Sequence, residues 1–325
     1  MKYIDLHCDT IMALMQNENS SLIDCNLQIN LEKLKNGKNI LQCFAMFVYL
    51  KGNDNPFDTC IKMIDRYYKE IEANKDSIAP VFKYSDFEDN QKKGLISSLL
   101  TIEEGAVTMG KLEYLRTLYR LGVRMICLNW NFINGIGHPN FVLKDNEKPD
   151  FKNPNVDFGL TEYGFSMIKQ MNELGIIIDV SHLSDKGFYD VIDTTTKPIV
   201  ASHSNARSVC NNVRNLTDDM ILKLKNNGGV MGINFCADFM NDDGVIGKNT
   251  IDCAIKHMKY IKELAGIEVL AIGTDFDGIN PDIEINGAHL LPKLFSRMAI
   301  EGFSAEDIEA VAYKNFLRVL KANLE

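Results

Sequence analysis

Short apolar runs recur along this chain, separated by longer segments in which apolar and charged residues are mixed. The runs are rich in Val, Ile, Leu and Phe and are almost continuously hydrophobic. Such runs are typical of parallel strands that are buried on both faces. We predict eight strands, over Tyr3–His7, Leu41–Tyr49, Ile96–Ile102, Val123–Asn129, Gly175–Ser181, Ile199–Ser202, Gly229–Asn234 and Val269–Gly273.

The segments between these runs have the spacing of amphipathic helices. In Lys111–Leu121, every third residue from position 112 onward is a leucine, among several charged residues. Thr161–Leu174 opens with a polar cap and stops directly before a glycine, which is typical of a helix end. We predict further helices over Thr217–Asn226, Asn249–Leu264 and Ser304–Leu324, the last of which begins with a capping box.

The repeated alternation of strand and helix predicts a (β/α)8 TIM-type barrel. An open doubly wound sheet is the main alternative, and the count of eight strands favours the barrel. The chain has 325 residues, which is an ordinary length for such a barrel, and it contains no linker rich in Pro, Gly or Ser. We therefore predict a single barrel domain over residues 1–325.

Composition and charge narrow the classes of partner. Hydrophobic residues make up 46% of the chain, enough for a large core, and the net charge of −9 gives no electrostatic reason to bind nucleic acid or an anionic membrane. No apolar stretch approaches the roughly 20 residues of a membrane span, and no signal peptide is evident. The eight cysteines form no CxxC pair and several lie in apolar runs. We therefore expect reduced thiols and a cytoplasmic protein.

Polar residues with the chemistry of metal ligands follow five of the eight predicted strands. A lone histidine or acid at such a place is commonly a loop or capping residue. Five separate coincidences are less plausible than one shared cause, because the carboxyl ends of barrel strands converge on one mouth. The residues at these ends are His7 and Asp9; Glu103 and Glu104; Asp179, Ser181 and His182; His203; and Asp275 and Asp277.

Imidazole and carboxylate groups that converge in this way predict a site for divalent transition metals. One tetrahedral zinc needs only three protein ligands. This chain offers five, with Asp275 as a sixth, so we predict two ions that share a bridging carboxylate. Nitrogen ligands favour zinc over magnesium. The five predicted ligands are His7, Asp9, Glu104, His182 and His203.

The same residues form an ordered set of motifs: DLHCDT, EEG, IDVSH, SHSNARSVCNNVRN and IGTDFDG, from Leu6 to Gly278. This set resembles the membrane (renal-type) dipeptidase family of zinc metallopeptidases, and the chain is similar to a soluble member without a membrane anchor. The resemblance implies a (β/α)8 barrel, two Zn2+ ions and hydrolysis of dipeptides.

The resemblance also implies a role for each matching residue. His7 and Asp9 would bind the first zinc, and His182 and His203 the second. Glu104 would bridge both ions, with Glu103 as a neighbour that binds neither. Arg214 would hold the carboxylate of the substrate, and Asp275 would transfer protons between the nucleophile and the leaving amine.

The chain departs from the family pattern just after the fourth strand. Family members with a substrate-polarising histidine carry it there, whereas the aligned residue in this chain is Trp130. Trp130 is interpreted either as core packing or as a wall of the substrate pocket. Asn131, Asn129 and His138 are the candidates for a replacement hydrogen-bond donor, and we include Trp130, Asn131 and His138 among the predicted substrate-binding residues.

The resemblance implies that a hydroxide bridging two zinc ions attacks the peptide bond. A related amidohydrolase acting on N-acyl amino acids or cyclic amides is the alternative. That pattern would show His-x-His on the first strand or a lysine after the fourth, and neither is present. A barrel that binds without catalysis is a second alternative, although every expected ligand is present. The resemblance also implies a homodimer, for which the sequence identifies no interface.

Overall fold

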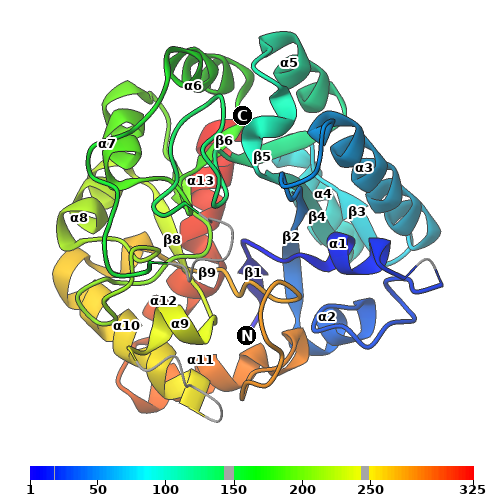
Figure 1. Cartoon of the computed structure of the whole chain (residues 1–325). Helices are drawn as coiled ribbons and strands as arrows, with labels where there is room; N and C mark the ends of the chain where they lie inside the picture. The colour runs from blue at the N-terminus through cyan, green and yellow to red at the C-terminus, as the bar shows by residue number, and fades with distance from the viewer. Residues whose placement is uncertain (18, 143–149, 243–248) are drawn as a thin grey trace.

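The computed structural model describes residues 1–17, 19–142, 150–242 and 249–325, and its centre is a barrel of parallel strands ringed by helices (Figure 1). The sheet runs in the order β1-β2-β4-β5-β6-β7-β8-β9, and all of its pairs are parallel. The strands are β1 (Tyr3–Asp5), β2 (Asn39–Phe47), β4 (Ile96–Glu103), β5 (Val123–Cys127), β6 (Ile177–Asp179), β7 (Val200–Ala201), β8 (Val230–Ile233) and β9 (Leu270–Ile272). All eight predicted strands are present, with shifted ends.

The barrel is joined between its last and first strands by individual backbone hydrogen bonds. The amide of Leu6 donates to the carbonyl of Ile272 at 2.9 Å, and the amide of Asp275 donates to the carbonyl of His7 at 3.3 Å. These bonds place the segments that follow β1 and β9 side by side at the mouth of the barrel. A ninth strand, β3 (Ile78–Pro80), pairs with β4 outside this path and was missed because three residues carry no readable pattern.

Helices surround the barrel, as the alternating pattern predicted (Figure 1). Those of the first half are α1 (Thr10–Met15), α2 (Leu31–Gly37), α3 (Pro56–Ala73), α4 (Tyr84–Lys93), α5 (Leu112–Arg120) and α6 (Glu162–Leu174). Those of the second half are α7 (Asp185–Thr194), α8 (Asp218–Asn227), α9 (Ala237–Met240), α10 (Thr250–Ala265), α11 (Leu291–Ile300), α12 (Ala305–Glu309) and α13 (Asn315–Leu324). The predicted helix ends hold: Thr161 caps α6, which stops at Gly175, and Ser304 forms the capping box of α12.

The apolar core has two layers, which together decide where a site can form. Most buried apolar residues lie between strands and surrounding helices. A smaller group inside the barrel includes Leu41, Leu99 and Met125, and it packs against Phe316 and Leu320 of α13. The C-terminal helix therefore closes the amino-terminal end of the barrel, where Figure 1 shows it in red behind the strands. The other end stays available for polar side chains.

Among the described residues, no helix is both long and apolar enough to cross a membrane.

Candidate metal centre and substrate cavity

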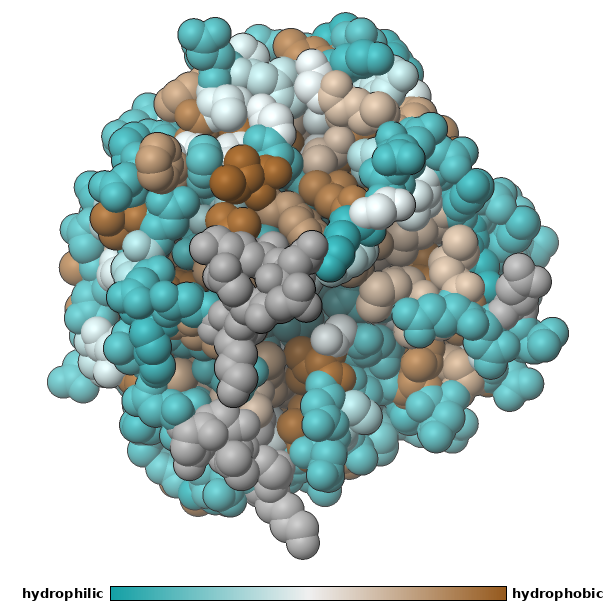
Figure 2. All heavy atoms as spheres, in the orientation of Figure 1, coloured by the Kyte–Doolittle hydropathy of each residue, from teal (hydrophilic) through white to brown (hydrophobic). Residues whose placement is uncertain are grey.

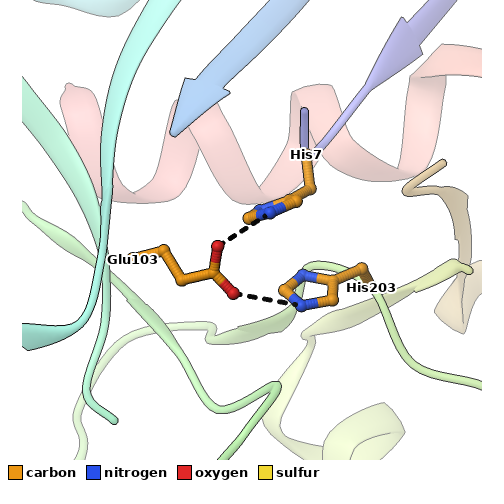
Figure 3. Close-up of side chains that lie close together, drawn as sticks. All are labelled: His7, Glu103 and His203. Carbon is orange, nitrogen blue, oxygen red and sulfur yellow. Dashed lines mark ion pairs between the residues drawn. The ribbon is translucent and has the colours of Figure 1, made fainter. Parts of the chain in front are cut away.

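A single carboxylate, that of Glu103, lies between three histidines at the carboxyl ends of the strands, and Figure 3 shows it with two of them, His7 and His203. Its Oε2 is 3.2 Å from Nε2 of His7, and its Oε1 is 3.1 Å from Nε2 of His182 and 3.6 Å from Nε2 of His203. All four side chains are buried. These four groups come from four strands, so tertiary folding alone brings them together.

His7 also lies close to two further carboxylates, those of Asp9 and Asp275. Nε2 of His7 lies 3.5 Å from Asp9 and 3.9 Å from Oδ1 of Asp275. Two three-residue sets in the described chain are compact enough to hold a cation, and both include His7: one is completed by Glu103 and His203, the other by Asp9 and Asp275. The site thus offers two adjacent groups of nitrogen and oxygen ligands, the donor chemistry of a divalent transition-metal pair.

Two buried atoms indicate that these groups lack a partner. Nε2 of His7 and Oδ1 of Asp9 make no hydrogen bond within the described chain. Buried polar atoms are otherwise almost always paired, because an unpaired one keeps the full cost of losing water. Nε2 of His7 faces the carboxylates of Asp9, Glu103 and Asp275, so a bound cation would satisfy it, and the donor set fits a metal.

The structure contradicts the predicted choice between the two adjacent glutamates. Glu103 enters the site, whereas the carboxylate of Glu104 accepts hydrogen bonds from the amide of Ala106 at 2.9 Å, the amide of Trp130 at 3.0 Å and the side chain of Asn134. Glu104 has a left-handed backbone, with φ of 87°, and it fixes the loop after β5. It is a structural residue.

The alternation along β4 explains this correction. Leu99 faces the barrel interior, whereas Leu100 and Ile102 face the surrounding helices. Successive strand residues point to opposite faces, so Glu103 shares the interior side with Leu99. The sequence carried this signal, and the prediction overlooked it.

Neighbouring side chains fix the orientation of two of the histidines. Oδ1 of Asn131 lies 2.8 Å from Nδ1 of His182, and an amide oxygen can only accept, so that nitrogen carries the proton. The Ser202 hydroxyl donates to Asp179 and therefore accepts from Nδ1 of His203, at 2.7 Å. Both arrangements leave Nε2 as a lone-pair donor toward the site. Asp179 thus acts on His203 through Ser202, as an orienting residue.

The electrostatics of the ligand cluster depend mainly on burial. Burial lowers the pKa of His182 and His203 well below the usual value, with Arg214 adding to the effect, so both imidazoles are neutral. Burial also lowers the pKa of His7, but Glu103 and Asp9 outweigh it and raise that pKa. Burial raises the pKa of Glu103 to about 7. A cation would favour the ionised acids and the neutral imidazoles together.

Asp275 sits at the edge of the cluster with one oxygen held and the other free. Its Oδ2 accepts a hydrogen bond from Asn234 at 3.0 Å, while Oδ1 faces His7. Burial raises the pKa of Asp275 to about 6. Gly278 allows this packing, because a Cβ there would lie 2.1 Å from Asp9 and 2.9 Å from Asp275. Asp277 instead ties two loops together by accepting from Thr10 at 2.6 Å and from the amide of Gln28 at 2.7 Å.

Arg214 is a buried cation that forms no ion pair with any described residue. It is 1% exposed, and within the described chain no carboxylate lies within 4 Å of it. Its guanidinium donates to the carbonyls of Ser181 and His203 and lies 3.1 Å from Nε2 of His182, but its Nε has no partner among the described residues. A buried charge of this kind is costly unless something pairs with it. The position therefore suits an anionic group of a ligand.

These residues lie at the bottom of a cavity of about 220 Å3. Figure 2 shows apolar residues, in brown, on the face that carries it. The predicted residues Trp130 and Asn131 line this cavity, as do Asp9, His182, Arg214 and Asp275. The prediction missed an aromatic lining made of Phe47, Phe141, Phe151 and Phe239. These phenylalanines come from four separate segments, and nothing in their local sequence marks them.

His138 does not belong to this cavity lining, which contradicts its predicted role in substrate binding. Its ring stacks on Phe158 with 5.1 Å between centroids, and its backbone pairs with Gly159 and Ser184. Of the predicted replacement donors, Asn131 lines the cavity, whereas Asn129 donates to the carbonyls of Phe132 and Gly137 and, like His138, is not part of the lining. Trp130 forms part of the cavity wall.

Comparison with known proteins decides the family. The sequence profile of the membrane dipeptidase family, peptidase family M19, matches residues 1–324. The chain belongs to the membrane dipeptidase family. An uncharacterised dipeptidase of Schizosaccharomyces pombe is 31% identical over 90% of this chain and 71% of its own length. A protein of Klebsiella pneumoniae from the region 5′ of pqqA is 33% identical over 73% of this chain and 86% of its own length.

Solved structures of this dipeptidase family have the same fold. The metallopeptidase dipeptidase AC superposes with a TM-score of 0.90 at 23% identity, over 100% of this chain and 99% of that one. A metallopeptidase of Rhodobacter sphaeroides, solved with a phosphinate mimic of the dipeptide L-Ala-D-Ala, gives 0.90 at 22% identity over 99% of both chains. The predicted family, the (β/α)8 barrel and the class of activity, a metallo-dipeptidase, are thereby confirmed.

Proposed function

We propose that this membrane dipeptidase family member hydrolyses dipeptides with two zinc ions held by His7, Asp9, Glu103, His182 and His203. The observation that carries the proposal is the position of Glu103, whose two carboxylate oxygens face His7 on one side and His182 and His203 on the other. A carboxylate placed between two groups of ligands is suited to bridging a pair of ions. When bound, the ions supply Lewis acidity, which lowers the pKa of water and polarises the peptide carbonyl.

Asp275 is the proposed proton carrier. Asn234 holds Oδ2, so Oδ1 is the oxygen that is free to receive a proton beside His7 and to deliver it to the leaving amine. The carboxylate is positioned at the cavity edge by the left-handed backbone at residue 275, with φ of 64°. This geometry supports a general base that becomes a general acid in the second half of the reaction.

Arg214 is the proposed anchor for the substrate's terminal carboxylate. The unpaired Nε and the absence of a carboxylate near this buried guanidinium, within the described chain, support that role. A charge-assisted bond to a carboxylate would compensate the buried cation. A fixed anchor inside a cavity of about 220 Å3 favours dipeptides, because a longer peptide would carry its carboxylate away from Arg214.

The experiment uses purified protein in three states: as isolated, stripped with a chelator, and reloaded with zinc. We expect close to two zinc ions per chain by elemental analysis, hydrolysis of Ala-Ala, and loss and recovery of that activity with the metal. Ala-Ala amide, which lacks the terminal carboxylate, serves as the matched substrate and should be cleaved far more slowly. A protein that holds at most one ion and cleaves no dipeptide would contradict the proposal.

Two further parts of the proposal concern the protein's setting. All eight cysteines are free thiols, which supports a reducing, cytoplasmic location. The homodimer implied by the family resemblance stays a prediction, and sedimentation of the purified protein would test it.

A further inference from the structure

An aromatic wall rises directly beside the proposed carboxylate anchor. The guanidinium of Arg214 lies over the ring of Phe239, 5.1 Å from its centroid. Phe151 packs edge-on against Phe239 at 6.2 Å and against Phe141 at 4.9 Å. All three rings line the cavity, so Phe239, Phe151 and Phe141 form one continuous surface, called the phenylalanine wall below.

This wall offers a substrate no charge and no side-chain hydrogen-bond partner. Among the described residues that line the cavity, the formal charges belong to Arg214 and to Asp9, Glu103 and Asp275. Arg214 is the proposed anchor, and the three acids belong to the proposed catalytic centre. A polar side chain placed against the phenylalanine wall would lose water without gaining a partner, whereas an apolar one gains by burial.

Two fixed points decide which part of a dipeptide meets this wall. The terminal carboxylate is held at Arg214, and the scissile carbonyl must lie at the cluster around Glu103. The backbone of the C-terminal residue therefore spans the space between them. The guanidinium of Arg214 also contacts Ser181, His182 and His203, so the apolar surface beside the anchor is the Phe239 ring. We expect the side chain of the C-terminal residue to lie against this ring.

We propose that the phenylalanine wall selects dipeptides whose C-terminal residue has a large apolar side chain, preferably an aromatic one. This inference rests on the proposed dipeptidase function and adds the class of substrate. Aromatic rings pack well edge-on against other rings, and the three phenylalanines already pack tilted or edge-on in a series that a substrate ring would extend.

The first experiment compares Ala-Phe, Ala-Leu, Ala-Ala, Ala-Lys and Ala-Asp as substrates of the zinc-loaded enzyme. Burial of a benzyl group predicts that kcat/KM for Ala-Phe exceeds that for Ala-Ala by about 10- to 100-fold. Equal values, or a preference for a charged C-terminal residue, would overturn the inference while leaving the dipeptidase function intact. Failure to cleave any of the five would instead contradict the proposed function.

A second readout does not depend on catalysis. Trp130 is the single tryptophan of the chain and lines this cavity, so its fluorescence reports binding there. Non-hydrolysable phosphinate mimics of Ala-Phe and Ala-Ala are titrated into the zinc-loaded protein. We expect the Ala-Phe mimic to bind about 10- to 100-fold more tightly. Equal affinities would overturn the inference even if no peptide is cleaved.

Variants then assign the preference to the wall. Phe239→Ala should reduce the Ala-Phe to Ala-Ala ratio about tenfold, and Phe239→Leu should keep most of it. The Phe239 carbonyl accepts from Asn205 and Asn215, so the backbone stays anchored without the ring. Phe151→Ala is the second variant in case the first does not fold. Phe158→Ala, an exposed ring outside the cavity lining, is the matched control and should leave the ratio unchanged. A ratio that survives both wall variants would overturn the assignment.

Discussion

The adjacent residues Glu103 and Glu104 provide a matched pair for testing the metal centre. Each is changed to glutamine, which keeps the size of the side chain and removes its charge. Glu103→Gln takes a charged oxygen away from a group that lies 3.1 to 3.6 Å from three imidazole nitrogens. Removing a group that hydrogen-bonds to a metal ligand weakens metal binding about 10- to 100-fold. Removing a ligand itself should therefore weaken metal binding by at least about 100-fold. Losing several kcal/mol of electrostatic stabilisation predicts about a 1,000-fold fall in kcat/KM.

Glu104→Gln should act on stability instead. Its two oxygens accept three N–H donors, and a glutamine would turn its own NH2 group toward at least one of them. A hydrogen bond to a charged group contributes about 1.5–3 kcal/mol. Because burial raises the pKa of Glu104 to about 7, part of that charge is already neutralised near neutral pH. We therefore expect a loss of about 1–2 kcal/mol in the free energy of unfolding, with the metal content unchanged.

The assays are zinc content by elemental analysis, dipeptide hydrolysis, and denaturant unfolding of both variants and the parent. The expected result is a clean separation, with metal and activity lost in one variant and stability lost in the other. If Glu104→Gln lost its zinc while Glu103→Gln retained both zinc and activity, the structural assignment of the two residues would be refuted and the first interpretation of the sequence restored.

Two further predictions concern residues around the site. Ser202→Ala removes the hydroxyl that accepts a hydrogen bond from Nδ1 of His203, so zinc affinity, measured in competition with a chromogenic chelator, should fall about 10- to 100-fold. Ser204→Ala is the control, because the Ser204 hydroxyl has no partner within the described chain, and it should leave zinc affinity unchanged. Burial raises the pKa of Asp277 from 3.8 to about 6, so the folded state binds this proton more tightly than the unfolded state does and loses stability as pH rises from about 4 to 6. In metal-free protein, Asp277→Asn should therefore flatten the dependence of the unfolding free energy on pH across that window. An unchanged slope would contradict the assignment.

Much of the fold was predictable because it rests on local patterns. The eight barrel strands are short buried runs, and parallel strands covered on both faces must be apolar almost throughout. Helix limits were readable where a cap or a glycine marks them, as at Thr161 and Gly175. The short strand β3 was not, since its three residues gain their strand geometry only from pairing with β4.

Most residues of the candidate site were predictable because they directly follow predicted strands. His7, Asp9, His182, His203 and Asp275 all stand where the sequence predicted, around one mouth. Their common position follows from a general property of barrels, in which the carboxyl ends of all strands meet. The choice of Glu103 over Glu104 failed because the motif was matched by its letters, without following which face of β4 each residue occupies.

The sequence by itself thus determined the class of barrel, the family and most of the residues around the predicted metal pair, because hydrophobic periodicity and residue order are local properties of the chain. The tertiary structure alone decided that His138 lies outside the cavity lining and that Arg214 and three phenylalanines from separate segments share one cavity. Those facts depend on distances between residues far apart in the chain. Such distances arise only once the strands and helices have packed.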